Sequence, residues 1–441
     1  MRISKEAEKK GVAMRAHMGR ASLAELPKRK FDPLELLQQA SAGHIARLLP
    51  LKFQLMSLSP FVFFRGAVAI MAADLGQGRH TRIEVQMCGD AHVKNFGFFA
   101  TPGSDIVLDI NDFDETMRGP WEWDVKRMAA SIVLAGRSAH DSESCCKEAV
   151  HLFVRDYCSW IRAFAGMTAL NIARHRTVRS LGDPAIRAAL KQAERSSPLA
   201  SLEKLTHKRG RGRRFIYKSG SMWDVKGAEE KAVIKALAGY RATLAPDRQL
   251  LFDRYSVADV GFKVVGTGSV GTRDYVVLLL GRDGAEKDPL FLQIKQELPS
   301  AYAGYYKGRS GPGHQGERVA LGQRALQVFS DLLLGWCTIQ GGDYLVRQLN
   351  DHKSSIAPEA LKGRRLIEYG RVCAELLAKG HARSGEPAVL AAYLGRPGKA
   401  EKALAQFAMA YAGQVEKDYK AFCKALKNHF VRDAMKFADK L

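Results

Sequence analysis

The chain has 441 residues, of which 46% are hydrophobic and 26% are charged, as in a globular protein with enough apolar material for a core. It contains no apolar run of about eighteen residues, which excludes a transmembrane helix, and its seven cysteines show no Cys-x-x-Cys spacing, which argues against a disulfide framework or a zinc site and favours a reducing cytoplasm. The net charge of +22 favours anionic partners such as phosphates, nucleotides, nucleic acid or anionic lipid.

The first part of the chain is predicted to be helical around two short strands. A Ser-Pro pair opens a helix over residues 61–75, and strands are expected at 82–87 and 106–110. Residues 122–137 carry apolar side chains at i, i+3, i+4, i+7 and i+8, which predicts an amphipathic helix. Helical periodicity continues to about residue 195.

The composition changes after the middle of the chain. Residues 204–218 form a basic segment interrupted by glycines, which predicts a loop, and residues 228–244 are helical again. Residues 264–281 and 289–296 are rich in β-branched and aromatic residues, which predicts a small antiparallel sheet.

The last third of the chain returns to helix. A helix is expected over 316–334 and a strand over 344–349. From residue 361 onward the sequence is helical, with breaks near Gly385 and Gly395.

These elements predict the α+β class with three parts. Residues 1–250 form a mostly helical part with the candidate catalytic and metal-binding loops, and residues 251–350 form a small β-rich part. The helices of residues 351–441 are expected to pack back on the first part.

Acidic and amide residues follow the two early strands. CGDAHVKNFG contains Asp90 and Asn95, and LDINDFDET contains Asp112 and Asp114. Phosphoryl transfer needs a carboxylate that orients or deprotonates the attacking hydroxyl, and an Asn oxygen and a second carboxylate that hold Mg²⁺ against the phosphates. We assign Asp90 to the first role and Asn95 and Asp112 to the second, with Asp114 as a further metal ligand. Singly, Asp and Asn at strand ends are as often ordinary turn residues.

Three neighbouring side chains compete for roles in this cluster. Asp109 and Glu115 are alternative metal ligands because they flank the same loop. His92 is expected to brace its loop through hydrogen bonds rather than to ligate a metal.

A glycine-rich segment, Gly266-Thr-Gly-Ser-Val-Gly271, has the G-x-G-x-x-G spacing. It lacks the lysine of a Walker loop, and it runs into a strand rather than into the helix of a dinucleotide-binding unit. A glycine loop inside a β-hairpin is the arrangement of protein kinases, whose loop covers the nucleotide phosphates. Gly266, Gly268, Ser269 and Gly271 are therefore the predicted nucleotide contacts, and a hairpin without a ligand is the alternative.

Lys295 lies in a strand one hairpin after the glycine loop, like the kinase lysine that contacts the α- and β-phosphates. We expect it to serve both nucleotide binding and catalysis. Its acidic partner is expected on the following helix at Glu317, with Glu297 as a second candidate. Because such a lysine acts only near the metal site, we expect the β-rich part to pack over the loops at 89–124, with Lys295 within about 10–12 Å of Asp112.

Residues 88–95, Cys-Gly-Asp-Ala-His-Val-Lys-Asn, resemble the H-G-D-x-H-x-x-N loop of the aminoglycoside-kinase and choline-kinase branch of the kinase-like fold, and depart from it only at the first position. In that branch a Gly and a helix-borne Asp follow the metal-binding Asp by seven and twelve residues, as Gly119 and Asp124 follow Asp112 here. The resemblance implies that Asp124 braces the catalytic loop. It also implies a protein-kinase-like two-lobed fold, with a mostly helical large lobe and a small antiparallel sheet lobe.

In kinases the glycine loop precedes the catalytic loop, whereas here it follows, so our working hypothesis is a circularly permuted order. From about residue 55 to residue 425 the chain resembles the bacterial domain-of-unknown-function family 2252. The resembling segments are residues 59–66, 89–97, 111–115, 119–124, 266–271, 344–349 and 381–385. This resemblance implies a kinase-like fold and no particular substrate.

The favoured function is an ATP- and Mg²⁺-dependent phosphotransferase whose acceptor is an unknown small alcohol or amine rather than a protein. A nucleotide-binding regulatory protein, or a nucleotidyl transferase with the same metal site, is the second hypothesis. A nucleic-acid-binding protein is the third, suggested by the net charge and by residues 204–218, although no base-reading motif accompanies them. Arg65, His381 and Arg383 are candidate anion ligands, with salt bridges or helix-end capping as their alternative roles.

Overall fold

The computed structural model describes residues 4–438 apart from residues 104, 178–183, 211, 219, 265–269, 282–284, 309–310 and 350–353. Helices account for 54% of the protein and strands for 18%, in several antiparallel sheets, which confirms the α+β class. Within the described residues no helix is both long and apolar enough to cross a membrane. All seven cysteines lie in the described part and are free, as their spacing predicted.

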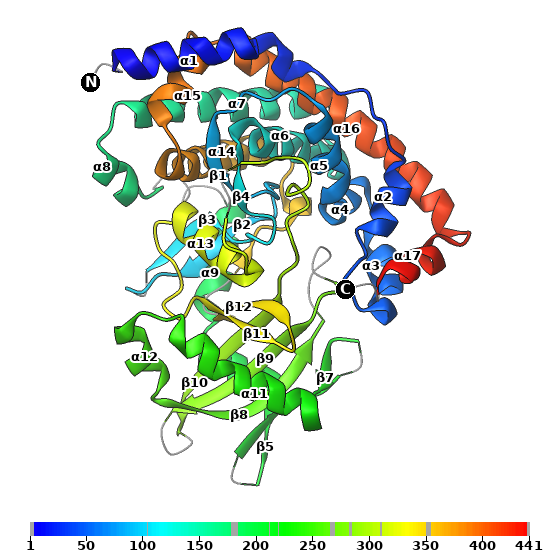
Figure 1. Ribbon diagram of the computed structural model, residues 1–441, viewed down its shortest axis with the longest axis vertical. Coiled ribbons are helices and arrows are strands. Elements are labelled where there is room, and N and C mark those ends of the chain that lie inside the picture. The colour runs from blue at the N-terminus through cyan, green and yellow to red at the C-terminus, as the bar shows by residue number, and fades with distance from the viewer. Residues whose placement is uncertain are drawn as a thin grey trace.

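Most helices gather around one large core, in the upper part of Figure 1. They are α1 (Lys5–His17), α2 (Pro33–Gln39), α3 (Leu49–Met56), α4 (Pro60–Gly66), α5 (Val68–Gln77), α6 (Trp121–Ser138), α7 (Glu143–Ala165), α8 (Ala169–Arg174), α14 (Arg364–Ser384), α15 (Pro387–Leu394), α16 (Lys399–Leu426) and α17 (Phe430–Ala438), with short 3₁₀ turns at Arg20–Ala24, Ala46–Leu48 and Pro358–Ala360. The predicted breaks near Gly385 and Gly395 are confirmed by the ends of α14 and α15.

Helix α6 is the centre of this core. It packs against α7, α14 and α16, and its residues from Trp121 to Gly136 are all buried. The predicted apolar stripe of residues 122–137 is therefore confirmed, but the polar side of the helix is buried as well. Any charged residue on α6 must consequently find a partner inside the protein.

The helix expected over residues 61–75 is two helices, α4 and α5, which meet at Ala67. Ser59 caps α4 by accepting a hydrogen bond from the Val62 N–H at 3.2 Å. Helix α4 ends at Gly66. A Cβ at Gly66 would lie 2.7 Å from the Met56 side chain, so α4 packs closely on α3. The break leaves Arg65 in the last turn of α4.

Two small antiparallel sheets carry the candidate catalytic loops. Their strands are β1 (Glu84–Met87) paired with β4 (Met117–Pro120), and β2 (Phe96–Ala100) between β3 (Ile106–Ile110) and β13 (Ser354–Ser355). The loop at 88–95 joins β1 to β2, and the loop at 111–116 joins β3 to β4. Because Met87 pairs with Met117, and the Asn111 N–H donates to the Asn95 carbonyl at 2.9 Å, the two loops run side by side.

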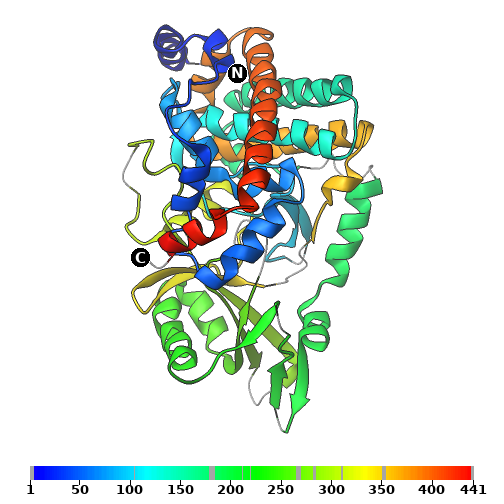
Figure 2. The same cartoon turned by 90° about the vertical axis from the view of Figure 1, so that its right-hand side faces the viewer.

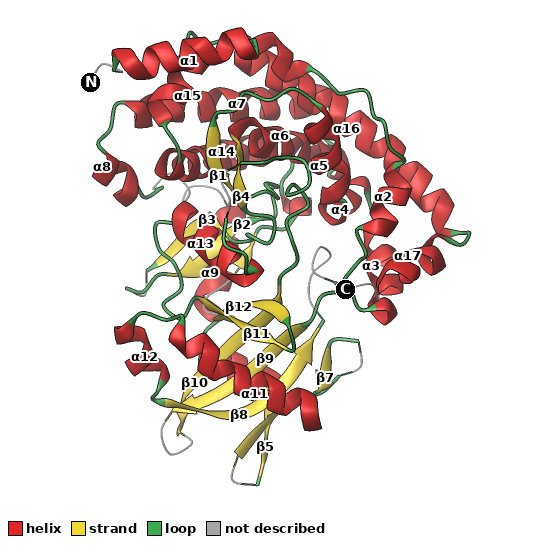
Figure 3. Ribbon diagram, in the orientation of Figure 1, coloured by secondary structure: helices red, strands yellow, loops and turns green. Residues whose placement is uncertain are grey.

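A six-stranded antiparallel sheet fills the lower part of Figure 3, in the order β11-β12-β10-β9-β8-β7. Its strands are β7 (Met222–Asp224), β8 (Tyr255–Lys263), β9 (Asp274–Gly281), β10 (Ala285–Gln296), β11 (Gly335–Ile339) and β12 (Gly342–Gln348). Helix α13 (Gln315–Leu326) lies between this sheet and the β1–β4 pair, which places the sheet next to the candidate catalytic loops.

Elements that precede residue 251, the predicted start of the β-rich part, also pack on or pair with this sheet. Helix α11 (Gly227–Ala242) packs on β11 and contributes Val233, Leu237 and Tyr240 to the core on one face of the sheet. Strand β7 extends the edge beside β8, and α12 (Pro246–Phe252) follows α11. The predicted antiparallel sheet is thus present, with the further strands β7, β8 and β11 and a covering helix.

Two local predictions were wrong. Residues 204–218 contain a hairpin, β5 (Thr206–Arg209) and β6 (Gly212–Phe215), which follows α9 (Pro184–Arg195) and α10 (Pro198–Leu205) and projects at the end of the molecule opposite α1 (Figure 2). The many basic residues of this segment obscured the strand pattern in the sequence. In the structure Phe215 is buried against Phe291. The helix expected over 316–334 ends at Leu326, and the following turn is held by Asp331, whose carboxylate accepts from the Leu333 and Gln348 N–H groups.

The contact between α13 and the sheet can be tested at Gly316, where a Cβ would lie 2.2 Å from the Tyr344 carbonyl oxygen of β12. We expect Gly316→Ala to force the helix off the strand and to lower the free energy of unfolding by about 1–3 kcal/mol, as overpacking does. Urea unfolding measures this change. Gly413→Ala in α16 is the control, because its Cβ meets nothing within 4 Å and alanine is favoured in helices. Equal stability of the two variants would contradict the packing.

Candidate functional site

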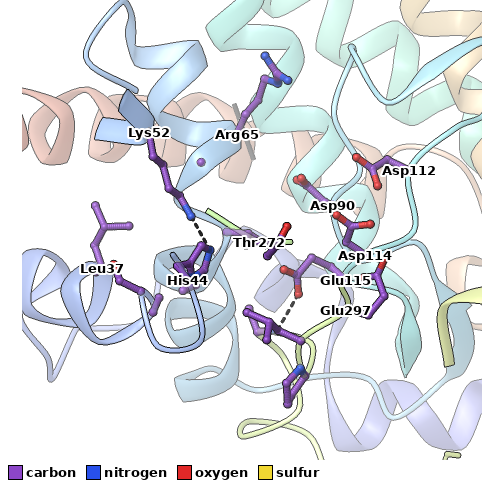
Figure 4. Close-up of a pocket in the computed structure, with 18 of the residues that line it drawn as sticks. Leu37, His44, Lys52, Arg65, Asp90, Asp112, Asp114, Glu115, Thr272 and Glu297 are labelled. Carbon is purple, nitrogen blue, oxygen red and sulfur yellow. Dashed lines mark hydrogen bonds between the residues drawn. The ribbon is translucent and has the colours of Figure 1, made fainter. Parts of the chain in front are cut away.

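A cavity of about 350 Å³ lies where the loops after β1 and β3 face the helices that precede them in the chain. Figure 4 shows Asp90, Asp112, Asp114, Glu115 and Glu297 on one side, and Leu37, His44 and Lys52 on the other. Asn95 also lines the cavity. The structure therefore brings together the four residues to which the sequence assigned the catalytic base and the metal.

The loop at 88–95 is fixed from beneath by Asp124 of α6. Its carboxylate accepts hydrogen bonds from the Cys88 N–H at 2.8 Å and the Gly89 N–H at 2.9 Å, so the bracing contact that the resemblance implied is present. Gly89 has φ +80°, and a Cβ there would lie 2.1 Å from the Glu115 carbonyl oxygen, so only glycine fits. The Asn95 side-chain amide donates to the Asp90 carbonyl at 2.8 Å, which ties the two ends of the loop together.

Two of the three candidate anion ligands support the structure instead. His381 Nε2 lies 3.1 Å from the Asp124 carboxylate, and its Nδ1 lies 2.8 Å from the Tyr157 hydroxyl. Arg383 donates to the backbone carbonyls of Ala325 at 3.1 Å and Ala173 at 2.6 Å, in the last turns of α13 and α8. Of the three, only Arg65 lines the cavity.

Asp90 carries an ion pair that the sequence did not reveal. Arg127 of α6, fully buried, places Nε and Nη2 each 2.5 Å from Asp90 Oδ1, and it also donates to the Phe64 carbonyl at 3.1 Å. Burial alone would raise the pKa of Asp90, but Arg127 and His92 outweigh burial and lower it. Asp90 is therefore a permanently ionised, weakly basic carboxylate, better suited to orienting a hydroxyl than to removing its proton beforehand.

His92 has the bracing role expected of it. Its Nε2 lies 3.5 Å from Asp90 Oδ2, and its Nδ1 accepts from the Lys94 N–H at 3.2 Å. Burial lowers the pKa of His92, so the ring is neutral and holds the loop by hydrogen bonding.

Asp112 and Asp114 form a close pair on which the charges of Lys295 and Arg347 act. The Lys295 ammonium is ion-paired with Asp114. Burial raises the pKa of Asp114, but Lys295 outweighs it and lowers the pKa, whereas burial and the charge of Asp114 both raise the pKa of Asp112. Asp112 Oδ1 is buried and has no hydrogen-bond partner among the described residues. Asp112 therefore offers an unpartnered carboxylate oxygen, the kind of ligand that Mg²⁺ takes.

The donor set fits Mg²⁺ better than a metal held by protein alone. Within the described residues no three His, Cys, Asp or Glu side chains are arranged to hold a metal ion. Mg²⁺ usually takes one or two carboxylates and completes its shell with water and substrate phosphates. Asp112 and Asn95 together meet that requirement, with Asp114 adjacent.

The partner of Lys295 is Asp114 rather than Glu317. Glu317 lies in the first turn of α13, where its backbone N–H donates to Nδ1 of the capping residue His314 at 3.2 Å. Glu297, the second candidate, lies close enough for its charge to raise the pKa of Lys295, and its Oε1 is buried without a partner among the described residues. Because Asp114 is two residues from Asp112, the expected convergence of Lys295 on the metal loop is present.

The glycine loop connects β8 and β9, which pair as an antiparallel hairpin, as predicted. Gly266, Gly268 and Ser269 lie outside the described residues. Gly271 has φ +114°, and its carbonyl accepts from the Ile45 N–H at 2.6 Å, so the end of the loop is docked on the segment before α3.

Asp109 and Glu115, the alternative metal ligands suggested by the sequence, have other partners. Asp109 is buried in an ion pair with Lys379 at 2.5 Å and does not line the cavity. Glu115 lines it, but its carboxylate accepts from the Ala301 N–H at 2.6 Å.

Two arginines of the basic hairpin at 204–218 are ion-paired with neighbouring acids. Arg213 pairs with Glu203 at 2.8 Å and Glu286 at 3.2 Å, and Arg214 pairs with Asp259 at 2.6 Å. Paired arginines are poorly available to phosphates, which weakens the case for a nucleic-acid interface here.

The sequence also identifies the family. The family described as "Uncharacterized protein conserved in bacteria (DUF2252)" matches residues 44–425, which include all of the acidic residues of the cavity. The chain belongs to DUF2252. No curated protein and no solved structure matches it. Membership in DUF2252 names no substrate, so the chemistry must be argued from the cavity.

Sequence reasoning missed Arg127, Lys52 and His44. Arg127 had a weak signal, because it lies three residues after Asp124 on the predicted helix, which also carries Glu122, Lys126 and Arg137. Lys52 and His44 had no sequence signal, because the only pattern in the segment that contains them is helical periodicity.

The anchoring role of Asp124 gives a stability test. In Asp124→Asn the side chain loses an acceptor for the two backbone N–H groups, so we expect the free energy of unfolding to fall by about 1–3 kcal/mol. The Cys88 and Gly89 amide hydrogens should also exchange faster with solvent. Asp433→Asn, at an exposed acid of α17, is the control and should change stability by less than about 0.5 kcal/mol. Unchanged exchange at both amides would contradict the anchor.

Proposed function

We propose that this protein is an ATP- and Mg²⁺-dependent phosphotransferase of the protein-kinase-like type, with its parts in permuted order and a small alcohol or amine as acceptor. One observation carries the proposal. Lys295, from the strand after the glycine hairpin, reaches across to Asp114 on the loop that also holds Asp112. Two segments far apart in sequence thereby supply a phosphate-binding lysine and metal-binding carboxylates to one place.

The order of parts within the sheet supports a kinase-like relationship. A glycine hairpin, a strand bearing lysine and then a helix follow one another in kinases, as β8–β9, β10 and α13 do here. The paired loops bearing Asp90 and Asp112 lie beside that helix. Circular permutation of the chain would explain why the loops come first in sequence.

The proposed division of labour follows from the contacts. Asp112 and Asn95 would hold Mg²⁺, which neutralises the phosphate charge when bound. Lys295 would exchange its contact with Asp114 for one with the phosphates. The backbone at Gly266, Gly268, Ser269 and Gly271 would cover them.

Asp90 would orient the acceptor hydroxyl toward the transferred phosphorus. Its lowered pKa suits this role, because the bond to the leaving group is largely broken in the transition state of most phosphoryl transfers and a strong base is not needed. Arg127 holds the carboxylate in place.

Labelled ATP distinguishes this proposal from its rivals. The purified protein is incubated with Mg²⁺, a cell extract, and ATP labelled at either the γ- or the α-phosphorus. Transfer of the γ-label supports the phosphotransferase, and transfer of the α-label supports nucleotidyl transfer on the same site. Binding of ATP without transfer of either label would support a regulatory nucleotide-binding protein.

The metal role of Asp112 predicts a Mg²⁺-specific defect. In Asp112→Asn we expect the affinity for ATP in Mg²⁺ to fall roughly 10- to 100-fold, as for a lost contact to a charged group, and the affinity in EDTA to change little. Calorimetric titration in the two buffers measures both. Equal affinity of the variant and the wild type in Mg²⁺ would move the metal role to Asp114.

The orienting role of Asp90 predicts a defect in turnover. We expect Asp90→Asn to lower kcat by about 10²–10⁴-fold, with ATP affinity near normal, because Asp90 faces the acceptor. The variant leaves Arg127 without its ion pair, so circular dichroism must first confirm that it is folded at the assay temperature. Normal turnover in a folded Asp90→Asn would make Asp90 a turn residue only.

A further inference from the structure

The cavity has two walls of different origin and charge. The acidic wall consists of Asp90, Asp112, Asp114, Glu115 and Glu297. The helical wall is the segment of residues 37–69, from the end of α2 to the start of α5. In Figure 4 the helical wall presents Lys52 and His44 toward the side on which Glu115 and Asp114 lie.

Lys52 of the helical wall is a buried cation that makes no direct ion pair, and the charge of Glu115 on the acidic wall only partly offsets the effect of burial on its pKa. Its residue is 7% exposed, and its Nζ lies 3.0 Å from His44 Nε2. Among the described residues no carboxylate lies within ion-pair distance of it. An ammonium group has three N–H donors, so at least two of them are available to a molecule in the cavity.

His44 fixes the direction of this ammonium group. Its Nδ1 lies 3.3 Å from the Ala42 carbonyl, which accepts only from N–H, so the proton is on Nδ1 and the Nε2 lone pair faces Lys52. Burial and the charge of Lys52 lower the pKa of His44 to about 3, which keeps the ring neutral. Burial lowers the pKa of Lys52 to about 8, so most of the lysine remains charged at neutral pH.

Gly271 holds His44 in this position. A Cβ at Gly271 would lie 2.3 Å from His44 Cδ2, so the end of the glycine hairpin packs directly on the ring. The Lys52–His44 pair is therefore held in place by packing beside the proposed nucleotide-binding hairpin, and Lys52 is not a mobile surface side chain.

Arg65 adds a second cation to the helical wall. Its Nε is buried and has no hydrogen-bond partner among the described residues. Burial lowers the pKa of Arg65, while the charges of Asp90 and Asp112 raise it, so carboxylates of the acidic wall already act on this guanidinium. A buried charge without an ion-pair contact is costly, and for Lys52 an anion bound in the cavity would supply that contact.

We propose that Lys52 forms an anion subsite for the acceptor, which therefore carries a carboxylate or a phosphate ester in addition to the accepting hydroxyl or amine. This inference rests on the proposed phosphotransferase function and narrows its substrate class. The acceptor atom bonds to the γ-phosphorus as the bridging P–O bond breaks, ADP departs with the electron pair, and the acceptor proton passes by way of Asp90 to solvent. A cavity of about 350 Å³ admits only a small acceptor.

Inorganic phosphate is a direct probe of the subsite, because its binding needs neither nucleotide nor transfer. Calorimetric titration of the full chain at pH 7, without ATP or Mg²⁺, should show phosphate binding that Lys52→Met weakens roughly 10- to 100-fold, the loss of a charge-assisted contact. Lys126→Met is the matched control. Lys126 is also buried, its pKa is also lowered to about 8, and it packs on Phe407 outside the cavity. Equal losses in both variants, or no loss in Lys52→Met, would overturn the proposal.

Two further arms identify the source of the anion. In the presence of Mg²⁺ and a non-hydrolysable ATP analogue, phosphate should still bind, because the acceptor subsite and the nucleotide are occupied together. Competition between the two would assign Lys52 to the terminal phosphate of the nucleotide and would overturn the proposal. Replacing phosphate with acetate tests whether a carboxylate suffices.

The proposed function and this subsite fail in different ways. If phosphate binding depends on Lys52 but the protein transfers no label from ATP, the phosphotransferase proposal is wrong and the anion subsite stands. If the γ-label is transferred but phosphate binding does not depend on Lys52, the phosphotransferase proposal stands and the proposal of an anionic acceptor is wrong. The melting temperature of Lys52→Met confirms that the variant is folded, and it should equal or exceed that of the wild type because a buried unpaired charge is removed.

Discussion

The hydrogen bonds that the Asp124 carboxylate accepts from two consecutive backbone N–H groups hold the site together. Asp124 belongs to α6, which has no solvent-exposed face over most of its length, so the loop at 88–95 is anchored to the centre of the helical core. His381 and Tyr157 fix the carboxylate in turn from α14 and α7. The left-handed turn at Gly89 and the positions of Asp90 and Asn95 follow from this anchor, because the loop has no room to shift.

The same protein separates its buried charges into two groups. Acids that have a cation, such as Asp90 with Arg127 and Asp109 with Lys379, are held rigidly whether or not a ligand is bound. Other charged side chains keep a buried atom without a hydrogen-bond partner among the described residues. Asp112 Oδ1, Glu297 Oε1 and Arg65 Nε are three such atoms that line the cavity, whereas Asp274 Oδ1 and Glu375 Oε2 lie outside it.

Local sequence patterns predicted much of the fold and much of the candidate site. Asp90, Asn95 and Asp112 follow strands whose alternation is visible in sequence, and the stripe of α6 is long enough to be unambiguous. Contacts between distant segments were not predictable in this way. The partner of Lys295 lies 181 residues away, and nothing in the periodicity around Asp114 favours it over Glu317. Lys52 shows the same limit, because a lysine in a helix is ordinarily exposed, whereas this one is buried by the tertiary structure. The hairpin at 204–218 was not predicted because its buried strand positions include Thr206 and the ion-paired Arg213 beside Phe215, so no apolar alternation is visible in the sequence.

The two walls of the cavity come from separate stretches of the chain, residues 37–69 and the loops from residue 88 onward. A substitution in α2 or α3 can therefore alter the shape and charge offered to one half of a bound molecule without moving the carboxylates that face the other half. Such a division lets reactivity and selectivity diverge independently during evolution. It also gives protein engineers a defined segment to randomise when they seek new substrates, while the anchored loops are left untouched.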